Sequence, residues 1–304
     1  MENVKDLMQK IKELKEKKRA VILAHLYQIE DVQDVADFVG DSLELSRKAA
    51  ATDAEVIVFC GVKFMAETAK ILSPDKTVLL PAIDAGCPMA DMVEEKDVLQ
   101  LKAEHPQAAV VCYVNSSAEV KAVSDYCCTS SNAVKLVQNI PEDEIIFVPD
   151  QNLGCFISQK VPEKKFIFWK GYCPTHHRIN LDELEAIKKI HADVEFLVHP
   201  ECKTEIVEQA DFVGSTAQII RRAKESTAHN VIIGTEQGVY HRLKRENPDK
   251  NIYLLSPKLI CPNMKKTRLQ DVFAALDEMK YQIEVEKEIR EKALLALERM
   301  FQYS

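Results

Sequence analysis

The chain has 304 residues, of which 46% are hydrophobic and 29% charged, so it can form roughly two or three compact units with buried cores rather than a disordered chain. Its formal net charge is −8 and no run of five or more like charges occurs, which argues against a nucleic-acid partner. No stretch approaches the roughly 18 uninterrupted apolar residues that cross a membrane.

The first predicted element is an amphipathic helix at the N-terminus. Val4, Leu7, Met8, Ile11 and Leu14 share one helix face, with charged residues between them. This pattern differs from the continuous apolar segment of a signal peptide, so we expect a cytoplasmic protein. In that compartment the nine cysteines would be reduced, and any with a special role would be metal ligands or nucleophiles rather than disulfide partners.

Three similar segments follow along the chain. Each begins with an apolar strand that ends in two polar side chains separated by one residue, at residues 21–27 (VILAHLY), 109–115 (AVVCYVN) and 195–201 (EFLVHPE). Each then has a short apolar piece that opens a helical pattern, at residues 37–42 (DFVGDS), 126–131 (YCCTSS) and 211–216 (DFVGST). Such self-similarity indicates a repeated structural unit.

Each segment continues with two further strands and helical stretches. The strands lie at residues 55–60, 144–149 and 230–234, and then at 77–80, 165–169 and 251–255. Each copy therefore reads β-α-β-α-β-α-β. Continuous runs of Val, Ile and Leu indicate small parallel sheets buried between helices, with right-handed crossovers. One long doubly wound sheet is the alternative, and ligands bind beyond the carboxyl ends of the strands in either case.

These repeats predict an α/β fold of three αβα modules in a pseudo-threefold arrangement around a central site. Module 1 would span residues 1–88, module 2 residues 89–174 and module 3 residues 175–269. Residues 270–304 form a separate helical pattern, which we expect to pack with the N-terminal helix on module 1.

A Cys-Pro dipeptide follows the last predicted strand of every module. The cysteines are Cys87, Cys173 and Cys261, at intervals of 86 and 88 residues. By chance a given cysteine precedes a proline roughly one time in 25, so three pairs in equivalent positions indicate a shared role. The other six lack this register and are expected to be small buried hydrophobic residues. They are Cys60, Cys112, Cys127, Cys128, Cys155 and Cys202.

Three thiols at one edge of three modules can converge on a metal centre. Structural zinc has four protein ligands, and catalytic zinc usually includes His or a carboxylate among its ligands. A [4Fe–4S] cluster on three thiolates leaves one iron open, which can act as a Lewis acid. The residues favour a cluster, with zinc or plain core cysteines as the alternatives.

The polar side chains at the strand ends form three matched pairs. The pairs are His25 with Tyr27, Tyr113 with Asn115, and His199 with Glu201. One such residue alone would merely cap a sheet, but three pairs that face one axis favour acid–base chemistry.

Hydroxyl residues stand where a helix is predicted to begin in each module, at Ser42, Ser130 and Thr216. Helix capping is their ordinary role. The same position offers backbone N–H groups and the positive end of the helix dipole to an anion, and both roles can hold together. Ser131 and Ser215 are adjacent candidates.

Long motifs over essentially the whole chain match the pattern of one known family. They are AHLYQIEDVQDVADFVGDSLELSRKA, GVKFMAETAKIL, DAGCPMADM, YVNSSAEVKA, CCTSSNA, PDQNLG, KGYCPTHHRI, VHPEC, DFVGST, GTEQG and CPNMKKT. In this order they resemble quinolinate synthase, the A protein of de novo NAD biosynthesis. The resemblance implies a transferase-type enzyme that condenses iminoaspartate with dihydroxyacetone phosphate to quinolinate, with release of phosphate and two waters. It also implies a three-module fold and a [4Fe–4S] cluster on the three cysteines.

The same resemblance implies roles for the residues at the strand ends. Its catalytic residues would be Tyr27, Tyr113, Glu201 and His199. The substrate would contact a wider set of residues, namely His25, Ser42, Tyr113, Val114, Asn115, Ser130, His199, Pro200, Glu201 and Thr216. A C-x-x-C redox switch proposed for some relatives cannot operate here, because Met264 stands three positions after Cys261.

The implied partners are the two small substrates, with the L-aspartate oxidase that supplies iminoaspartate as a candidate protein partner. Two other functions compete with this one. An iron–sulfur hydro-lyase of the aconitase type would act on a hydroxy acid alone and release no phosphate. A zinc-stapled structural protein would be colourless, whereas a cluster protein would be brown.

Overall fold

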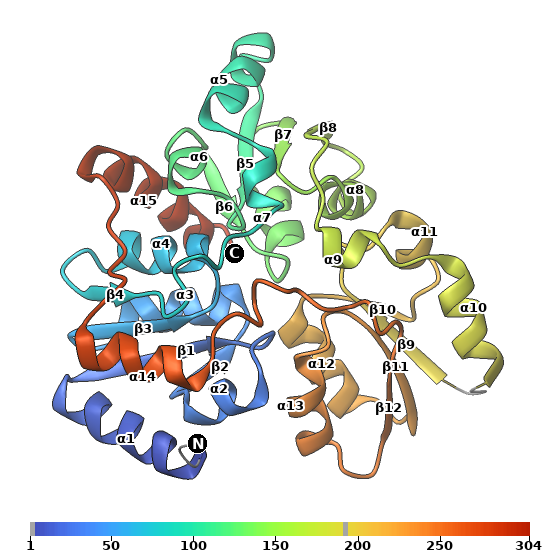
Figure 1. The fold of residues 1–304 in the computed structure, drawn as a ribbon. Coiled ribbons are helices and arrows are strands. Elements are labelled where there is room, and N and C mark those ends of the chain that lie inside the picture. Colours follow the sequence, from blue (N-terminus) through green and yellow to red (C-terminus); the bar gives the residue numbers. More distant parts are fainter. Residues whose placement is uncertain (1–3, 191–193) are drawn as a thin grey trace.

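Three separate four-stranded parallel sheets, each flanked by helices, surround a common centre (Figure 1). They are seen in a computed structural model that describes residues 4–190 and 194–304. The predicted α/β fold of three αβα modules is therefore confirmed, and one long sheet is excluded. The module boundaries at residues 88, 174 and 269 stay predictions. Within the described ranges, no helix is both long and apolar enough to span a bilayer.

The first sheet has the strand order β2-β1-β3-β4, the second β6-β5-β7-β8 and the third β10-β9-β11-β12. Every neighbouring pair of these strands is parallel. The strands are β1 Ala20–His25, β2 Phe38–Gly40, β3 Val56–Cys60, β4 Thr77–Leu79, β5 Ala109–Tyr113, β6 Tyr126–Cys128, β7 Glu144–Val148, β8 Lys165–Phe168, β9 Val194–Val198, β10 Phe212–Val213, β11 Asn230–Gly234 and β12 Asn251–Leu254.

Helices alternate with these strands and give the predicted β-α-β-α-β-α-β order in every module. They are α1 Val4–Lys17, α2 Glu30–Val35, α3 Ser42–Ala51, α4 Lys63–Leu72, α5 Glu95–Glu104, α6 Ala118–Ala122, α7 Ala133–Asn139, α8 Gln151–Lys160, α9 Pro174–His177, α10 Leu181–Ile190, α11 Thr204–Val207, α12 Thr216–Glu225, α13 Val239–Glu246, α14 Leu269–Glu278 and α15 Lys287–Gln302, with a 3₁₀ turn at Ala90–Met92.

Burial on both faces explains why the strands are continuous apolar runs. In β1, Ile22 lies in an apolar cluster with residues of α1 and α14. The next residue on the opposite face, Leu23, lies in a second cluster that also contains Leu197 and Val231 of the third module. Successive strand residues point to opposite faces, so one sheet joins two cores.

The C-terminal helices divide between two modules. Helix α14 packs against α1 and β3 of the first module, as expected, and Figure 1 shows α1 and α14 side by side. Helix α15 packs chiefly against α6 and β6 of the second module and also contacts α4. The prediction that the whole stretch packs on module 1 is therefore wrong for α15, whose apolar residues Ala293, Ala296, Leu297 and Met300 join the core of the second module.

In each sheet an aspartate accepts a hydrogen bond near the start of the module's first strand, which is β1, β5 or β9. Asp37 accepts a hydrogen bond from the backbone N–H of Ile22, and Asp125 accepts one from Val110. Asp211 accepts the corresponding bond from Phe196. All three distances are 2.8 Å, so the repeat extends to individual hydrogen bonds.

Asp41 joins the three modules at the centre. One carboxylate oxygen, Oδ1, caps α3 by accepting from the backbone N–H groups of Leu43 and Glu44 at 3.1 and 3.0 Å. The other, Oδ2, accepts from Ser131 Oγ of the second module at 2.6 Å and from Ser215 Oγ of the third at 3.1 Å. A single carboxylate that is 5% exposed thus ties the modules together.

We expect Gly238→Ala to lower the free energy of unfolding by about 1–3 kcal/mol, as overpacking does. An added Cβ would lie 2.7 Å from Tyr27 Cα and 2.8 Å from Leu26 O, across the contact between the third and first modules. Gly86→Ala is the control, because its Cβ would meet only Asp91 Oδ2 at 4.0 Å. Denaturant unfolding measures both variants, and equal midpoints would contradict the expectation.

Asp41→Ala should lower the free energy of unfolding by about 3 kcal/mol, because it removes a helix cap and two hydrogen bonds between modules. The comparison is Asn180→Ala, which removes one exposed bond to the backbone N–H of Glu183 and should cost about 1 kcal/mol. Thermal and denaturant unfolding of both variants test the difference. Loss of no more stability in Asp41→Ala than in Asn180→Ala would show that Asp41 does not join the modules.

Candidate active site

A central cavity lies where the carboxyl ends of the three sheets meet. Each module contributes one cysteine to its lining, and each contributes strand-end and helix-start side chains. The predicted residues that line it are Cys87, Cys173, Cys261, His25, Tyr27, Tyr113, Asn115, His199, Glu201, Ser42, Ser130 and Thr216. Val114 and Pro200 lie between members of two pairs and are not part of the lining.

The strand-end residues sit at or just beyond the ends of the strands. β1 ends at His25 and β5 at Tyr113, so Tyr27 and Asn115 lie in the turns that follow. The predicted strands therefore extended slightly too far. These turns direct the side chains toward the axis between the sheets, where ligands of parallel sheets bind.

The three cysteines converge, and they are the only cysteines among the described residues that line the cavity. Cys87 and Cys173 both pack against one apolar cluster, and Cys87 and Cys261 both pack against another. Burial raises the pKa of Cys87 to about 12 and also raises the pKa of Cys173 and Cys261. These thiols therefore stay protonated unless a bound cation replaces their protons.

Five of the six remaining cysteines are buried, as predicted for small hydrophobic residues of the core. Cys60, Cys112, Cys127, Cys128 and Cys202 are buried, whereas Cys155 is partly exposed.

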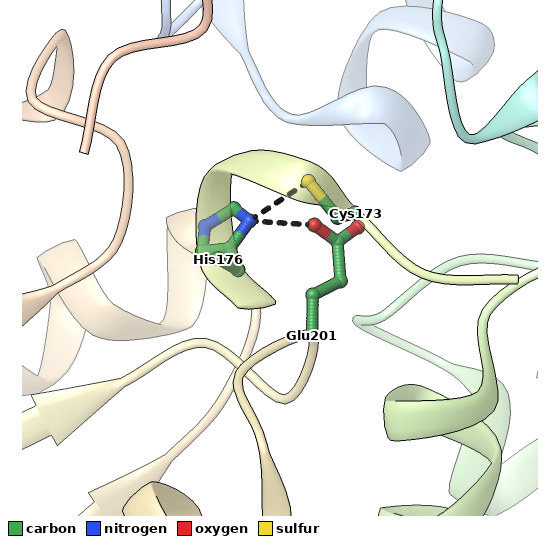
Figure 2. Close-up of side chains that lie close together, drawn as sticks. All are labelled: Cys173, His176 and Glu201. Atoms are coloured by element: carbon green, nitrogen blue, oxygen red, sulfur yellow. Dashed lines mark hydrogen bonds and ion pairs between the residues drawn. The ribbon is translucent and has the colours of Figure 1, made fainter. Parts of the chain in front are cut away.

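A histidine that sequence reasoning missed joins Cys173 to Glu201 (Figure 2). His176 lies in α9, which begins immediately after Cys173. Its Nδ1 is 3.2 Å from Cys173 Sγ and 2.8 Å from Glu201 Oε2. The three ligand atoms lie within 4.8 Å of one another and could hold a metal ion. Its position in the sequence, three residues after Cys173 in the motif KGYCPTHHRI, could have indicated that it lies beside this cysteine.

Glu201 is the charged centre of the cavity. Tyr113 Oη donates to Glu201 Oε1 at 2.7 Å. Burial alone would raise the pKa of Glu201, but the imidazoles of His199 and His176, together with hydrogen bonds from His176 and Tyr113, lower it below its usual range. Glu201 is therefore a carboxylate that stays ionised near pH 7.

Two histidines and two tyrosines of the cavity are neutral near pH 7. Burial lowers the pKa of His25 and of His199 to about 4. It raises the pKa of Tyr27 and of Tyr113 well above the usual value, and the charge of Glu201 adds to this effect in both. Both phenols are therefore protonated donors.

A chain of hydrogen bonds connects the two tyrosines across all three modules. Tyr27 Oη is 2.8 Å from Thr235 Oγ1, which is 2.9 Å from His176 Nε2. His176 then contacts Glu201, and Glu201 accepts from Tyr113. Hydroxyl and imidazole groups can both donate and accept, so this chain can move a proton between the modules.

The helix starts differ by one residue from the predicted capping. Asp41 and Ser215, rather than Ser42 and Thr216, cap α3 and α12, because their side chains accept the N–H bonds of the first turn. Ser42 and Thr216 are the first helical residues and face the cavity. Ser130 precedes α7 by three residues, and its Oγ is 3.2 Å from His199 Nε2.

One polar atom in the lining lacks a partner. Asn115 Oδ1 is buried and makes no hydrogen bond to any described residue. Buried polar atoms are nearly always satisfied, so an unpaired one beside a cavity is typical of a ligand contact.

Comparisons with known proteins identify the family of this chain. The family described as Quinolinate synthetase A protein (NadA) matches residues 9–302. Quinolinate synthase of Alkaliphilus metalliredigens is 57% identical over 300 residues, which are 99% of this chain and 99% of the relative. Quinolinate synthase of Caldicellulosiruptor bescii is also 57% identical over 300 residues, with the same coverage of both chains. That of Clostridium kluyveri is 56% identical over 294 residues, 97% of each chain. The chain therefore belongs to the quinolinate synthetase A protein family.

Proposed function

We propose that this chain is a quinolinate synthase of de novo NAD biosynthesis. In this proposal it condenses iminoaspartate with dihydroxyacetone phosphate to quinolinate, with release of phosphate and two waters. The observation that supports it most is the single cavity lined by one cysteine and one strand-end pair from each of three modules.

The donor set of the cavity fits a [4Fe–4S] cluster held by Cys87, Cys173 and Cys261. Three thiols from three directions suit three corners of a cluster. No fourth cysteine of the described residues lines the cavity, which would leave one corner for substrate. When bound, such a cluster would supply a Lewis acid at the centre of the cavity. A single ion on Cys173, His176 and Glu201 is the alternative, but it would leave two of the three repeat-related cysteines without a role.

Helix starts would bind the anionic groups of the substrates, and the unpaired amide oxygen of Asn115 would accept a hydrogen bond from a substrate donor. The N-terminal ends of α3 and α12 point Ser42 and Thr216 toward the cavity, where the helix dipole favours carboxylate or phosphate. Asn115, His25 and Ser130 line the same space and can donate or accept hydrogen bonds. This local attraction offsets the formal net charge of −8, which would otherwise repel anions.

Proton transfer would fall to Tyr27, Tyr113, Glu201 and His199. Glu201 is the candidate base, because its ionised carboxylate contacts both Tyr113 and His176 within the cavity. Tyr113 is positioned to return a proton through its 2.7 Å contact with Glu201. Isomerisation of the ketose, imine formation and two dehydrations each need such a positioned acid or base.

The proposal extends to the setting of the enzyme. We expect the protein to work in the cytoplasm, where its thiols stay reduced. Iminoaspartate would come from an L-aspartate oxidase, which makes that enzyme a candidate partner.

We predict that Cys87→Ala, Cys173→Ala and Cys261→Ala each lose the cluster, because each removes one of three thiolates. Cys155→Ala and Cys202→Ala are matched controls that should retain it, since neither residue lines the cavity. Iron and sulfide analysis with absorption near roughly 400 nm measures cluster content. A normal iron content in any of the first three variants would contradict the assignment.

Tyr27→Phe and Glu201→Gln should keep the cluster but slow turnover roughly 100-fold or more, as loss of a general acid or base does. Steady-state rates on protein of known iron content provide the measurement. Wild-type rates at wild-type iron content would show that these two side chains only support the fold.

The function itself is tested by an anaerobic assay for quinolinate from iminoaspartate and dihydroxyacetone phosphate, with and without iron reconstitution. Quinolinate and inorganic phosphate should appear in equal amounts, and only with iron. Turnover of a hydroxy acid without phosphate release would favour a hydro-lyase. Activity with zinc alone would favour the single-ion site.

A further inference from the structure

Each of the three Cys-Pro loops is held to its sheet by the same main-chain hydrogen bond. The backbone N–H of Lys63 donates to Ala85 O, that of Gln151 to Gly171 O and that of Gln237 to Leu259 O, all at 2.8 Å. Each acceptor lies two residues before the cysteine of its loop. This contact obeys the threefold repeat.

A second contact breaks the repeat. The residue just before each of these donors is the second one after the strand, and it is Val62, Asp150 or Glu236. Asp150 Oδ2 accepts from the backbone N–H of Cys173 at 3.1 Å. Glu236 Oε1 accepts from the backbone N–H of Cys261, also at 3.1 Å. The side chain of Val62 has no acceptor to offer to Cys87.

Both carboxylates are 0% exposed and are held at each oxygen. Asp150 Oδ1 accepts from the backbone N–H of Leu153 at 2.9 Å. Glu236 Oε2 accepts from the backbone N–H of Gly238 at 2.7 Å, and Lys265 Nζ is 2.9 Å from Glu236 Oε1. Burial of a carboxylate is unfavourable unless hydrogen bonds or an opposite charge satisfy its oxygens, as they do here.

The ion pair of Glu236 and Lys265 in the third module also contacts the first module. Lys265 Nζ also donates to the backbone carbonyl of Tyr27 in the first module. One continuous set of contacts therefore runs from the Cys261 loop through Glu236 and Lys265 to the turn that carries Tyr27.

We propose that Asp150 and Glu236 are positioning residues that hold the Cys173 and Cys261 loops around the metal centre, while the Cys87 loop lacks this second support. The inference rests on the proposed cluster for its consequence, since groups that orient ligands are what retain a metal. The three cysteines are thus equivalent by repeat but unequal in how firmly they are held.

Amide substitutions test this contact with little change of shape. Asn or Gln has one acceptor oxygen, so Asp150→Asn or Glu236→Gln must turn an NH₂ group toward a backbone N–H. One hydrogen bond is lost and two donors face each other in a buried site. The matched control is Asp125→Asn in the second sheet. Asp125 also accepts a backbone N–H, from Val110, but its other side-chain partner is Lys102 rather than a Cys-Pro loop.

The experiment loads each protein with iron and sulfide anaerobically and follows iron release to a ferrous chelator. Asp150→Asn and Glu236→Gln should release iron about 10-fold faster than wild type, whereas Asp125→Asn should match it. The EPR spectrum of the reduced cluster should change only in the first two. Release and spectra equal to wild type in folded Asp150→Asn and Glu236→Gln would overturn the proposal, and failure of either folded variant to take up a cluster would support it.

Amide hydrogen exchange in the wild-type protein provides a readout that needs no variant. The amides of Cys173 and Cys261 should exchange about 10-fold or more slowly than that of Cys87, because a buried carboxylate holds them. Equal exchange at the three cysteines would overturn the proposal. If wild type binds no iron, the proposed cluster fails, while the exchange ranking still tests the two contacts.

Discussion

The carboxylate of Asp41 is a contact at which all three modules meet. It caps a helix of the first module with one oxygen and accepts hydroxyl hydrogen bonds from the other two modules with the other. Where the three modules meet, the carboxyl ends of their strands face each other and enclose the cavity.

This arrangement makes the site a property of the whole chain rather than of one module. The hydrogen-bonded chain from Tyr27 to Tyr113 begins in the first module, passes through Thr235 and His176, and ends in the second. The carboxylate of Glu201 lies on this path between His176 and Tyr113. A proton can therefore move within the cavity without exposing it to bulk water.

Much of the fold could be predicted because its signal is periodic. Continuous apolar runs recur three times and give the strands and their succession along the chain, and the Cys-Pro register places the three thiols together. The order of the strands within each sheet was not predicted. Features that depend on one residue were harder. The N-cap of α3 lies one position before the predicted residue. Helix α15 packs on the second module, where it contacts α6 and β6.

His176, Asp150 and Glu236 were missed for a related reason. His176 has no counterpart in the other two loops, and the buried carboxylates occur in two modules but are replaced by Val62 in the first. A search for threefold repetition therefore passes over them. Their roles become visible only when hydrogen-bond partners are known, because burial without a partner would make a carboxylate unfavourable there.

The central claim is that three modules each deliver one thiolate to one metal centre. Diffraction from anaerobically grown crystals, with anomalous data at the iron absorption edge, tests it most directly. The account predicts one compact iron peak in the cavity, bonded to the sulfur atoms of Cys87, Cys173 and Cys261 and to no fourth protein ligand. A single ion bound by Cys173, His176 and Glu201, with Cys87 and Cys261 unbound, would contradict it.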